Sequence, residues 1–116
     1  MNEPRIAAVV VTLNRLGELE NCIASLRAQT RPADEIIVVV NGSTDGTREW
    51  LATQSDVYAV FQENYGAAGG FARGMREAVT RGFNWVWCLD DDAVAAPTAL
   101  AELCKAMHAR PEAGVF

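Results

Sequence analysis

Residues 35–47 read Glu-Ile-Ile-Val-Val-Val-Asn-Gly-Ser-Thr-Asp-Gly-Thr. The first half is almost entirely apolar and β-branched, as expected of a strand that is covered on both faces. The second half consists of glycines and short polar residues, which are typical of a turn that leads into a helix. A buried strand that ends directly in a polar turn is the repeating unit of α/β sheets.

The same unit recurs on both sides of this stretch. Apolar runs predict four strands, at Ile6–Thr12, Glu35–Val40, Val57–Gln62 and Asn84–Leu89. Helical spacing predicts four helices between and after them, at Leu16–Leu26, at Arg48–Gln54, after the glycine-rich segment Gly66–Gly70, and with Pro97 in the first turn of the last. Right-handed crossovers between such strands predict an α/β fold with an open, mainly parallel sheet and helices on both faces.

Composition excludes several classes of function. A chain of 116 residues fits one domain, and its net charge of −5 argues against binding to a nucleic-acid backbone. No apolar run approaches the roughly 18 residues of a membrane span, and the first residues do not indicate a signal peptide. Cys22, Cys88 and Cys104 lack metal-ligand spacing, so we expect reduced core thiols, and His108 is also expected to be structural.

Polar segments follow each of the predicted strands. They are residues 12–15, 41–45, 64–70 and 90–92. Ligands of open α/β sheets gather beyond the carboxyl ends of the strands, so we expect these four segments to meet at one edge. This convergence is the main functional prediction from the residues themselves.

Asp90, Asp91 and Asp92 follow the fourth strand without a spacer. Adjacent carboxylates repel one another, and a divalent cation such as Mg²⁺ or Mn²⁺ removes that cost. If the backbone stays extended, Asp90 and Asp92 point the same way, so we expect these two to hold the metal and Asp91 to be structural. The alternative is an acidic cap ahead of the helix that begins near Pro97.

The other polar segments each have a structural and a functional interpretation. The Asn41–Thr47 turn caps the next helix or meets a ribose or base, and Gly66–Gly70 permits tight packing or forms an anion site. Arg15, just past the first strand, is placed to reach a diphosphate. Trp85 and Trp87 share one strand face and are expected to be core residues.

Taken in order, these segments resemble the inverting family 2 glycosyltransferases with the GT-A fold, especially galactofuranosyl- and rhamnosyltransferase-like members. The resemblance extends over nearly the whole chain. It is carried by Val-Val-Val-Thr-Leu-Asn-Arg at 9–15, Gln-Thr-Arg-Pro at 29–32, residues 35–47 as quoted above, Asn-Tyr-Gly-Ala-Ala-Gly-Gly-Phe at 64–71, and Leu-Asp-Asp-Asp at 89–92.

The resemblance implies a nucleotide-binding half of a GT-A fold and a set of donor contacts. The implied donor-binding residues are Thr12, Asn14, Arg15, Asn41, Ser43, Asp45, Gly69, Gly70, Asp90 and Asp91, with Mn²⁺ or Mg²⁺ held by Asp90 and Asp92 in a DXD-type motif. The implied partners are a UDP- or TDP-type sugar donor and a glycan or lipid-linked acceptor, with no nucleic acid and no transmembrane segment. The implied location is the cytoplasm or the inner face of the membrane, in cell-wall or polysaccharide biosynthesis.

Two features depart from the family pattern. Val40 stands where the family usually has an acidic residue that helps to hold uracil, so Asn41 or Asp45 is expected to substitute. The family also uses a carboxylate general base, which we expect beyond Phe116. Residues 1–116 are therefore expected to be a nucleotide-sugar-binding domain, truncated before the acceptor region, with donor binding and little or no transfer of its own.

Two other functions remain open at this point. Asp90-Asp91-Asp92-Ala93-Val94 also fits the D-x-D-x-[TV] pattern of haloacid-dehalogenase-type phosphohydrolases, although that motif belongs on a first strand. The chain is alternatively a non-catalytic nucleotide-binding module. Covalent trapping of phosphate on Asp90 would identify the phosphohydrolase.

Overall fold

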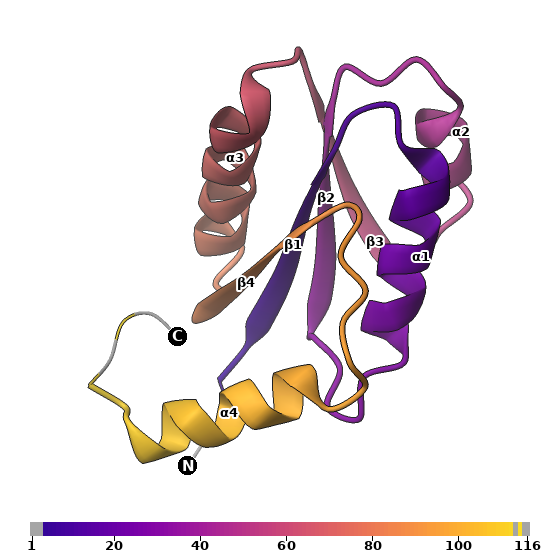
Figure 1. Ribbon diagram of the computed structural model, residues 1–116. Coiled ribbons are helices and arrows are strands. Elements are labelled where there is room, and N and C mark those ends of the chain that lie inside the picture. Colours follow the sequence, from indigo (N-terminus) through magenta and orange to yellow (C-terminus); the bar gives the residue numbers. More distant parts are fainter. Residues whose placement is uncertain (1–3, 113, 115–116) are drawn as a thin grey trace.

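The computed structural model describes residues 4–112 and 114, and within them the chain forms one sheet covered by helices (Figure 1). The strands are β1 (Ile6–Thr12), β2 (Glu35–Asn41), β3 (Val57–Gln62) and β4 (Trp85–Asp90). The helices are α1 (Leu16–Arg27), α2 (Thr47–Leu51), α3 (Gly66–Thr80) and α4 (Ala99–Ala109). All strand pairs are parallel, in the order β3-β2-β1-β4, which confirms the predicted α/β fold.

Helices cover both faces of the sheet, with α3 on one side and α1 and α2 on the other (Figure 1). The predicted apolar stripe of α1 is buried at Leu19, Cys22, Ile23 and Leu26, and packs with alternate residues of the two central strands. The intervening residues of these strands, such as Val9 and Val39, face α3. This two-sided burial explains why β1 and β2 read as continuous apolar runs. No helix within residues 4–112 is long and apolar enough to cross a bilayer.

Two glycines set the distance between α3 and the sheet. A Cβ atom built on Gly74 would lie 2.3 Å from Cγ1 of Val9, and one on Gly70 would lie 2.5 Å from Cγ1 of Val11. Both distances are far below ordinary van der Waals contact, so the helix lies where only glycine fits at these positions. This close approach places the amino end of α3 beside the carboxyl end of β2.

The start of α4 differs from the sequence prediction. The helix begins at Ala99 with Thr98 as its N-cap, so Pro97 precedes the helix instead of lying in its first turn. The Pro97 carbonyl accepts a hydrogen bond from the Thr30 backbone at 2.8 Å, which fixes the loop to the segment after α1. α2 is also shorter than the predicted Arg48–Gln54.

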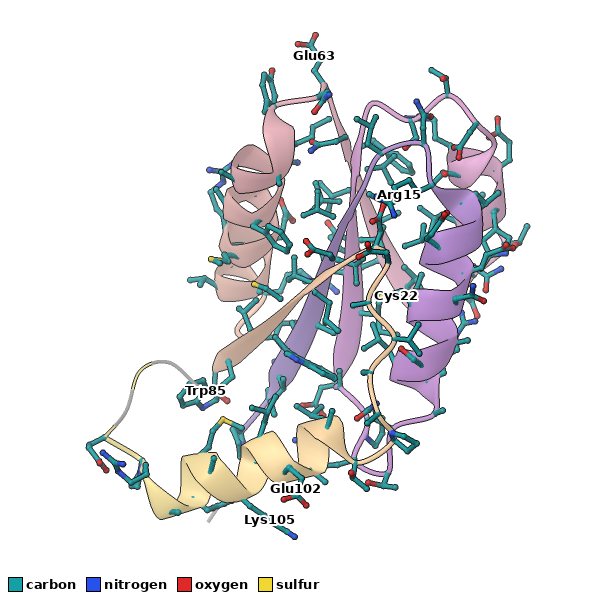
Figure 2. All side chains as sticks on the ribbon, viewed as in Figure 1. Arg15, Cys22, Glu63, Trp85, Glu102 and Lys105 are labelled. Atoms are coloured by element: carbon teal, nitrogen blue, oxygen red, sulfur yellow. The ribbon has the colours of Figure 1, made fainter. Side chains whose placement is uncertain are left out.

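The amino end of the sheet is closed by α4, whose apolar residues pack on Ile6. Trp85 and Trp87 pack against this cluster, which confirms their assignment to the core (Figure 2 labels Trp85). Cys104 is buried as predicted, but Cys88 is exposed on β4, so the core prediction is wrong there. The alternating pattern places Cys88 on the side of the sheet occupied by α3, and at the edge strand β4 its side chain is left uncovered.

The strand register aligns the carboxyl ends of the sheet. Thr12 lies opposite Val40, Val11 lies opposite Asp90, and Asn41 lies opposite Gln62. The loops that leave these strands therefore begin at the same level of the sheet. This alignment is the structural basis of the candidate site.

Candidate functional site

The loops after β1 and β2 are joined through Asn14. This residue has φ of +52°, a left-handed conformation in which asparagine is one of the few tolerated residues. Its backbone N–H donates to Ser43 Oγ at 3.0 Å, and its Oδ1 accepts the Thr44 backbone N–H at 2.7 Å. Two predicted donor contacts, Asn14 and Ser43, are thus adjacent, and each already uses a polar atom to hold the other loop.

The three aspartates form a turn. β4 ends at Asp90, and the Ala93 backbone N–H donates to the Asp90 carbonyl at 3.0 Å. The expectation that Asp90 and Asp92 point the same way assumed an extended backbone, and that assumption is wrong because the chain turns after Asp90. Asp91 is buried while Asp90 and Asp92 are exposed, which agrees with a structural role for Asp91. Metal binding by Asp90 and Asp92 stays a prediction.

Asp91 connects this turn to β1 and its loop. The Thr12 hydroxyl donates to Asp91 Oδ2 at 3.0 Å, inside the protein. Arg15 lies on the outer side, with Nε 3.6 Å from Asp91 Oδ1 and Nη2 3.4 Å from Asp92 Oδ2. Figure 2 shows Arg15 beside the turn that follows β4. The Thr12 hydroxyl is therefore already engaged with a carboxylate of the protein itself.

Cys22 lies beneath the aspartates as a neutral thiol. Its Sγ donates to the Asp90 carbonyl at 3.6 Å. Burial, and then the negative charges of Asp91, Asp92 and Asp90, raise the pKa of Cys22 to about 11. Because the thiolate is the nucleophile and metal ligand, Cys22 is inert at neutral pH, and its predicted core role is confirmed.

Asp45 holds the starts of two helices. Its Oδ1 accepts the Thr47 hydroxyl at 2.6 Å and the Thr47 backbone N–H at 3.2 Å, and its Oδ2 accepts the Leu16 backbone N–H at 3.1 Å. These bonds lower the pKa of the Asp45 carboxyl, with the Thr47 hydroxyl as the largest cause. Asp45 thus supports the first residues of both helices, although the N-cap position of α2 is Gly46 and not Asp45.

We expect Asp45→Ala to lower the free energy of unfolding by about 1 kcal/mol at pH 7, the typical effect of losing a helix cap. The folded-state pKa is depressed, so this stabilisation is present above the unfolded-state pKa of about 3.9 and is lost as pH falls through the folded value. Urea unfolding at several pH values should show the gap between wild type and variant closing below about pH 4. Glu20→Ala, which removes the same charge from the exposed side of α1, is the control, and an equal gap for it would contradict the assignment.

Asn41 ties β2 to the glycine-rich start of α3. Its Nδ2 donates to the Gly66 carbonyl at 2.9 Å, and its Oδ1 accepts from Gln62 Nε2 at 2.7 Å. The side chain is buried, and both of its polar groups are used inside the protein. Gln62 was not predicted as a site residue, although a polar residue that ends an apolar strand was a signal for it.

The glycine segment has a structural explanation at Gly70, which packs against Val11. A Cβ atom built on Gly70 would lie 3.2 Å from Asn41 Nδ2. Gly69 lies over the first turn of its own helix, where an added Cβ would be 2.7 Å from Cβ of Tyr65. Tight packing therefore accounts for both residues. Donor binding at Gly69 and Gly70 stays a prediction.

Gln29 is a second buried polar residue without a predicted role. Its Nε2 donates to the Ala96 carbonyl at 2.7 Å, and its Oε1 accepts the Leu100 backbone N–H at 3.0 Å. It therefore fixes the loop between the aspartates and α4 against α1. The residue lies in the Gln-Thr-Arg-Pro stretch at 29–32, but the sequence alone does not show what it bonds.

Two hollows of the described surface lie away from this edge. One, of about 390 Å³, lies at the amino ends of β2 and β3, beside Asp34, Asp56 and Tyr58. The other, of about 910 Å³, is an apolar groove along β4 that includes Val79 and Cys88. The convergence at the carboxyl edge is shown by contacts between the loops.

The donor set at the aspartate turn fits an open divalent-cation site. Residues 4–112 and 114 contain no group of three or more His, Cys, Asp or Glu side chains arranged to enclose a metal. Mg²⁺ and its analogues, however, are usually bound by one or two carboxylates together with substrate phosphates and water. The exposed Asp90 and Asp92 are available for that kind of binding, whereas the buried Asp91 is engaged with Thr12.

Comparison with known sequences points to one family. Residues 7–116 match the model described as Glycosyl transferase family 2. Galactofuranosyltransferase GlfT1 of Mycobacterium tuberculosis (strain ATCC 25618 / H37Rv) is 46% identical over 91 residues, which cover 75% of this chain and 30% of the relative. GlfT1 of Mycolicibacterium smegmatis is 37% identical over 106 residues, covering 89% and 35%. The chain thus spans about a third of the length of these relatives.

Solved structures agree with this match. The mannosyltransferase PcManGT of Pyrobaculum calidifontis, in complex with GDP-Man and Mn²⁺, has a TM-score of 0.73 at 29% identity, and the match covers 91% of this chain and 33% of that one. S. aureus TarS 1–349 in complex with UDP-GlcNAc has a TM-score of 0.70 at 19% identity, covering 92% and 32%. The second likeness shows the fold alone.

Proposed function

Because the chain belongs to glycosyltransferase family 2, we propose that it binds a nucleoside-diphosphate sugar at the carboxyl edge of its sheet for inverting transfer to a hydroxyl acceptor. The identity to galactofuranosyltransferases supports a galactofuranosyl donor. The acceptor is proposed to be a glycan or a lipid-linked glycan, and the location to be the cytoplasm or the inner face of the membrane. The phosphohydrolase is not proposed, because its motif lies on β4 and within the matched family region.

The observation that carries this proposal is the set of bonds that joins the polar loops. Asp91 joins the acidic turn to Thr12, Asn14 joins the β1 loop to Ser43, and Asn41 joins β2 to Gly66. Each bond links segments that are at least 25 residues apart in the chain. Four loops held at one edge form a rigid support on which a diphosphate and a nucleoside can be bound together.

In this proposal Asp90 and Asp92 would hold a Mn²⁺ or Mg²⁺ ion, whose charge would stabilise the nucleoside diphosphate as a leaving group. Arg15 adds a second positive charge at the same place, since its guanidinium lies beside Asp92. Displacement with inversion also needs a carboxylate that takes the proton of the acceptor hydroxyl. We assign that role to no residue of this chain.

Recognition of the base is proposed to be weakly selective. Val40 is buried in the core and offers no hydrogen bond to a base. The two expected substitutes are already engaged, Asn41 with Gly66 and Gln62, and Asp45 with Thr47 and Leu16. Main-chain groups of the 41–45 turn then contact the base, and both UDP- and TDP-sugars are proposed as donors.

The proposed function is tested by titrating the folded protein with UDP, GDP and TDP, with and without Mn²⁺, by calorimetry. We expect Mn²⁺-dependent binding, with UDP and TDP within about tenfold of each other (about 1.4 kcal/mol or less), because the same main-chain groups would contact both bases. Adenosine diphosphate serves as the mismatched nucleotide. Absence of Mn²⁺-dependent binding by every nucleotide would reject the donor site.

A further inference from the structure

Arg15 contacts two carboxylates that differ in their surroundings. Asp91 is only 9% exposed at its side chain and is held from behind by the Thr12 hydroxyl at 3.0 Å. Asp92 is 56% exposed, and Arg15 is the partner that the structure gives it. One end of the guanidinium, Nε, therefore faces a fixed carboxylate, while Nη2 faces a carboxylate open to solvent.

Both contacts of Arg15 are loose compared with other arginine pairs in the same protein. Its separations are 3.6 Å and 3.4 Å, whereas Arg27 contacts Asp56 at 2.7 Å and Arg81 contacts Glu35 at 2.6 Å. Charge-assisted hydrogen bonds are typically about 2.7–2.9 Å long, so Arg15 is held in place mainly by charge. A half-exposed side chain held in this way can exchange one partner for another at little cost.

We propose that Arg15 and a divalent cation compete for Asp92, so that the Arg15 guanidinium would move from Asp92 to the diphosphate of the donor when a cation is bound at Asp92. Asp91 keeps hold of Nε during this exchange, so the side chain pivots without leaving the site. The inference rests on the proposed function, because it needs a cation and a diphosphate at this edge. It makes Arg15 and Thr12 a coupled pair: Thr12 positions Asp91, and Asp91 positions Arg15.

The exchange has a physical basis in the charges present. Asp90, Asp91 and Asp92 carry the negative charge of the turn, the Arg15 guanidinium lies beside it, and Cys22 beneath it is neutral. A divalent ion on Asp92 would lie within a few ångströms of the guanidinium and repel it. A diphosphate offers the displaced Nη groups two oxygens in a planar, two-pronged geometry that suits arginine. Cation and donor would then bind cooperatively through one side chain.

The competition predicts effects of opposite sign in one variant. Arg15→Gln should bind Mn²⁺ alone about three- to tenfold more tightly, because a nearby positive charge is gone. At saturating Mn²⁺ the same variant should bind UDP about 10- to 100-fold more weakly, because charged hydrogen bonds to the diphosphate are lost. Arg15→Lys keeps the charge and should leave Mn²⁺ affinity unchanged while still weakening UDP binding.

Mn²⁺ affinity by electron paramagnetic resonance and UDP affinity by calorimetry provide the two measurements, with thermal unfolding to verify each fold. Arg76→Gln is the control, since it removes the same charge from an exposed position on α3. Opposite shifts for Arg15→Gln, with neither seen for Arg76→Gln, support the exchange. Loss of both affinities, or no change in Mn²⁺ affinity, overturns it and leaves the proposed function standing. Failure of the wild type to bind Mn²⁺ and UDP overturns both.

Discussion

Replacing Gly74 with alanine is expected to lower the free energy of unfolding by about 1–3 kcal/mol, although alanine is the better helix former. The added methyl would lie 2.3 Å from Cγ1 of Val9 and 3.3 Å from Cγ2 of Val39. Both valines are fully buried in central strands, so neither can move aside without disturbing the sheet. Overpacking at this contact outweighs the roughly 1 kcal/mol that alanine gains from helix propensity.

Two further variants make this prediction specific to the contact, with urea unfolding as the measurement. Gly17→Ala in α1 is the matched control, because a Cβ there meets nothing within 4 Å, and its stability should stay equal or rise by up to about 1 kcal/mol. Val9→Ala removes the opposing methyl groups. The free energy of unfolding of the double variant Gly74→Ala/Val9→Ala should be about 0.5–3 kcal/mol higher than the value predicted by adding the two single effects. Simple additivity would show that the two residues do not clash.

The strands were predictable because their signal is local. β1 and β3 match the predicted ranges Ile6–Thr12 and Val57–Gln62, and β2 extends one residue beyond the prediction, to Asn41. Continuous burial on both faces needs long apolar runs, and such runs are visible in one sequence. The predicted helices between successive strands provide the crossovers that parallel strands need. The convergence of the polar loops then follows, because the carboxyl ends of parallel strands lie at the same edge of the sheet.

The side-chain partners at the site were not predictable, because each bond joins residues that are distant in sequence. Asp91 could be judged structural, but its pairing with Thr12 spans 79 positions and depends on the register of β4 with β1. The sequence assumed an extended backbone through the aspartates, whereas the chain turns once the strand ends; the exposed–buried–exposed pattern of Asp90, Asp91 and Asp92 nevertheless agrees with the predicted alternation. Gly74 was not singled out at all, since a lone glycine in a helix does not show what it packs against.

The assignments of Asn41 and Asp45 show a related limit. Both lie in a turn whose composition suits either capping or ligand contact, and composition does not separate the two. The structure shows that the polar groups of Asn41 and the carboxylate of Asp45 already have partners inside the protein. Donor recognition by these side chains would have to use the donor and acceptor capacity left over from the bonds that hold β2 to α3 and α1 to α2. Sequence patterns identify which residues are polar and close together, but not which of them are free to bind.

The neighbouring aspartates Asp91 and Asp92 are expected to respond to substitution in opposite ways. Asp91→Ala should lower the free energy of unfolding by about 1–3 kcal/mol, because it leaves the buried Thr12 hydroxyl without its acceptor. Asp92→Ala should change the free energy of unfolding by no more than about 0.5 kcal/mol, because the Asp92 side chain is 56% exposed and its removal relieves like-charge repulsion. Denaturant unfolding of the two variants measures this difference.

Binding should show the reverse order of severity. Loss of a residue that supports a metal ligand typically weakens a metal site by roughly 10- to 100-fold. Because Asp92 is a proposed ligand itself, Asp92→Ala is expected to weaken Mn²⁺-dependent binding of UDP by at least that much. Asp91→Ala, where it folds, should keep the Mn²⁺ dependence and lose affinity only in part, because Asp90 and Asp92 remain while Arg15 loses the carboxylate that holds Nε. If Asp92→Ala instead destabilises the fold and leaves Mn²⁺-dependent binding intact, the acidic turn is a helix cap and the metal assignment is wrong. The exposed position of Asp92, next to a buried neighbour that already has its partners, is the reason to expect the first outcome.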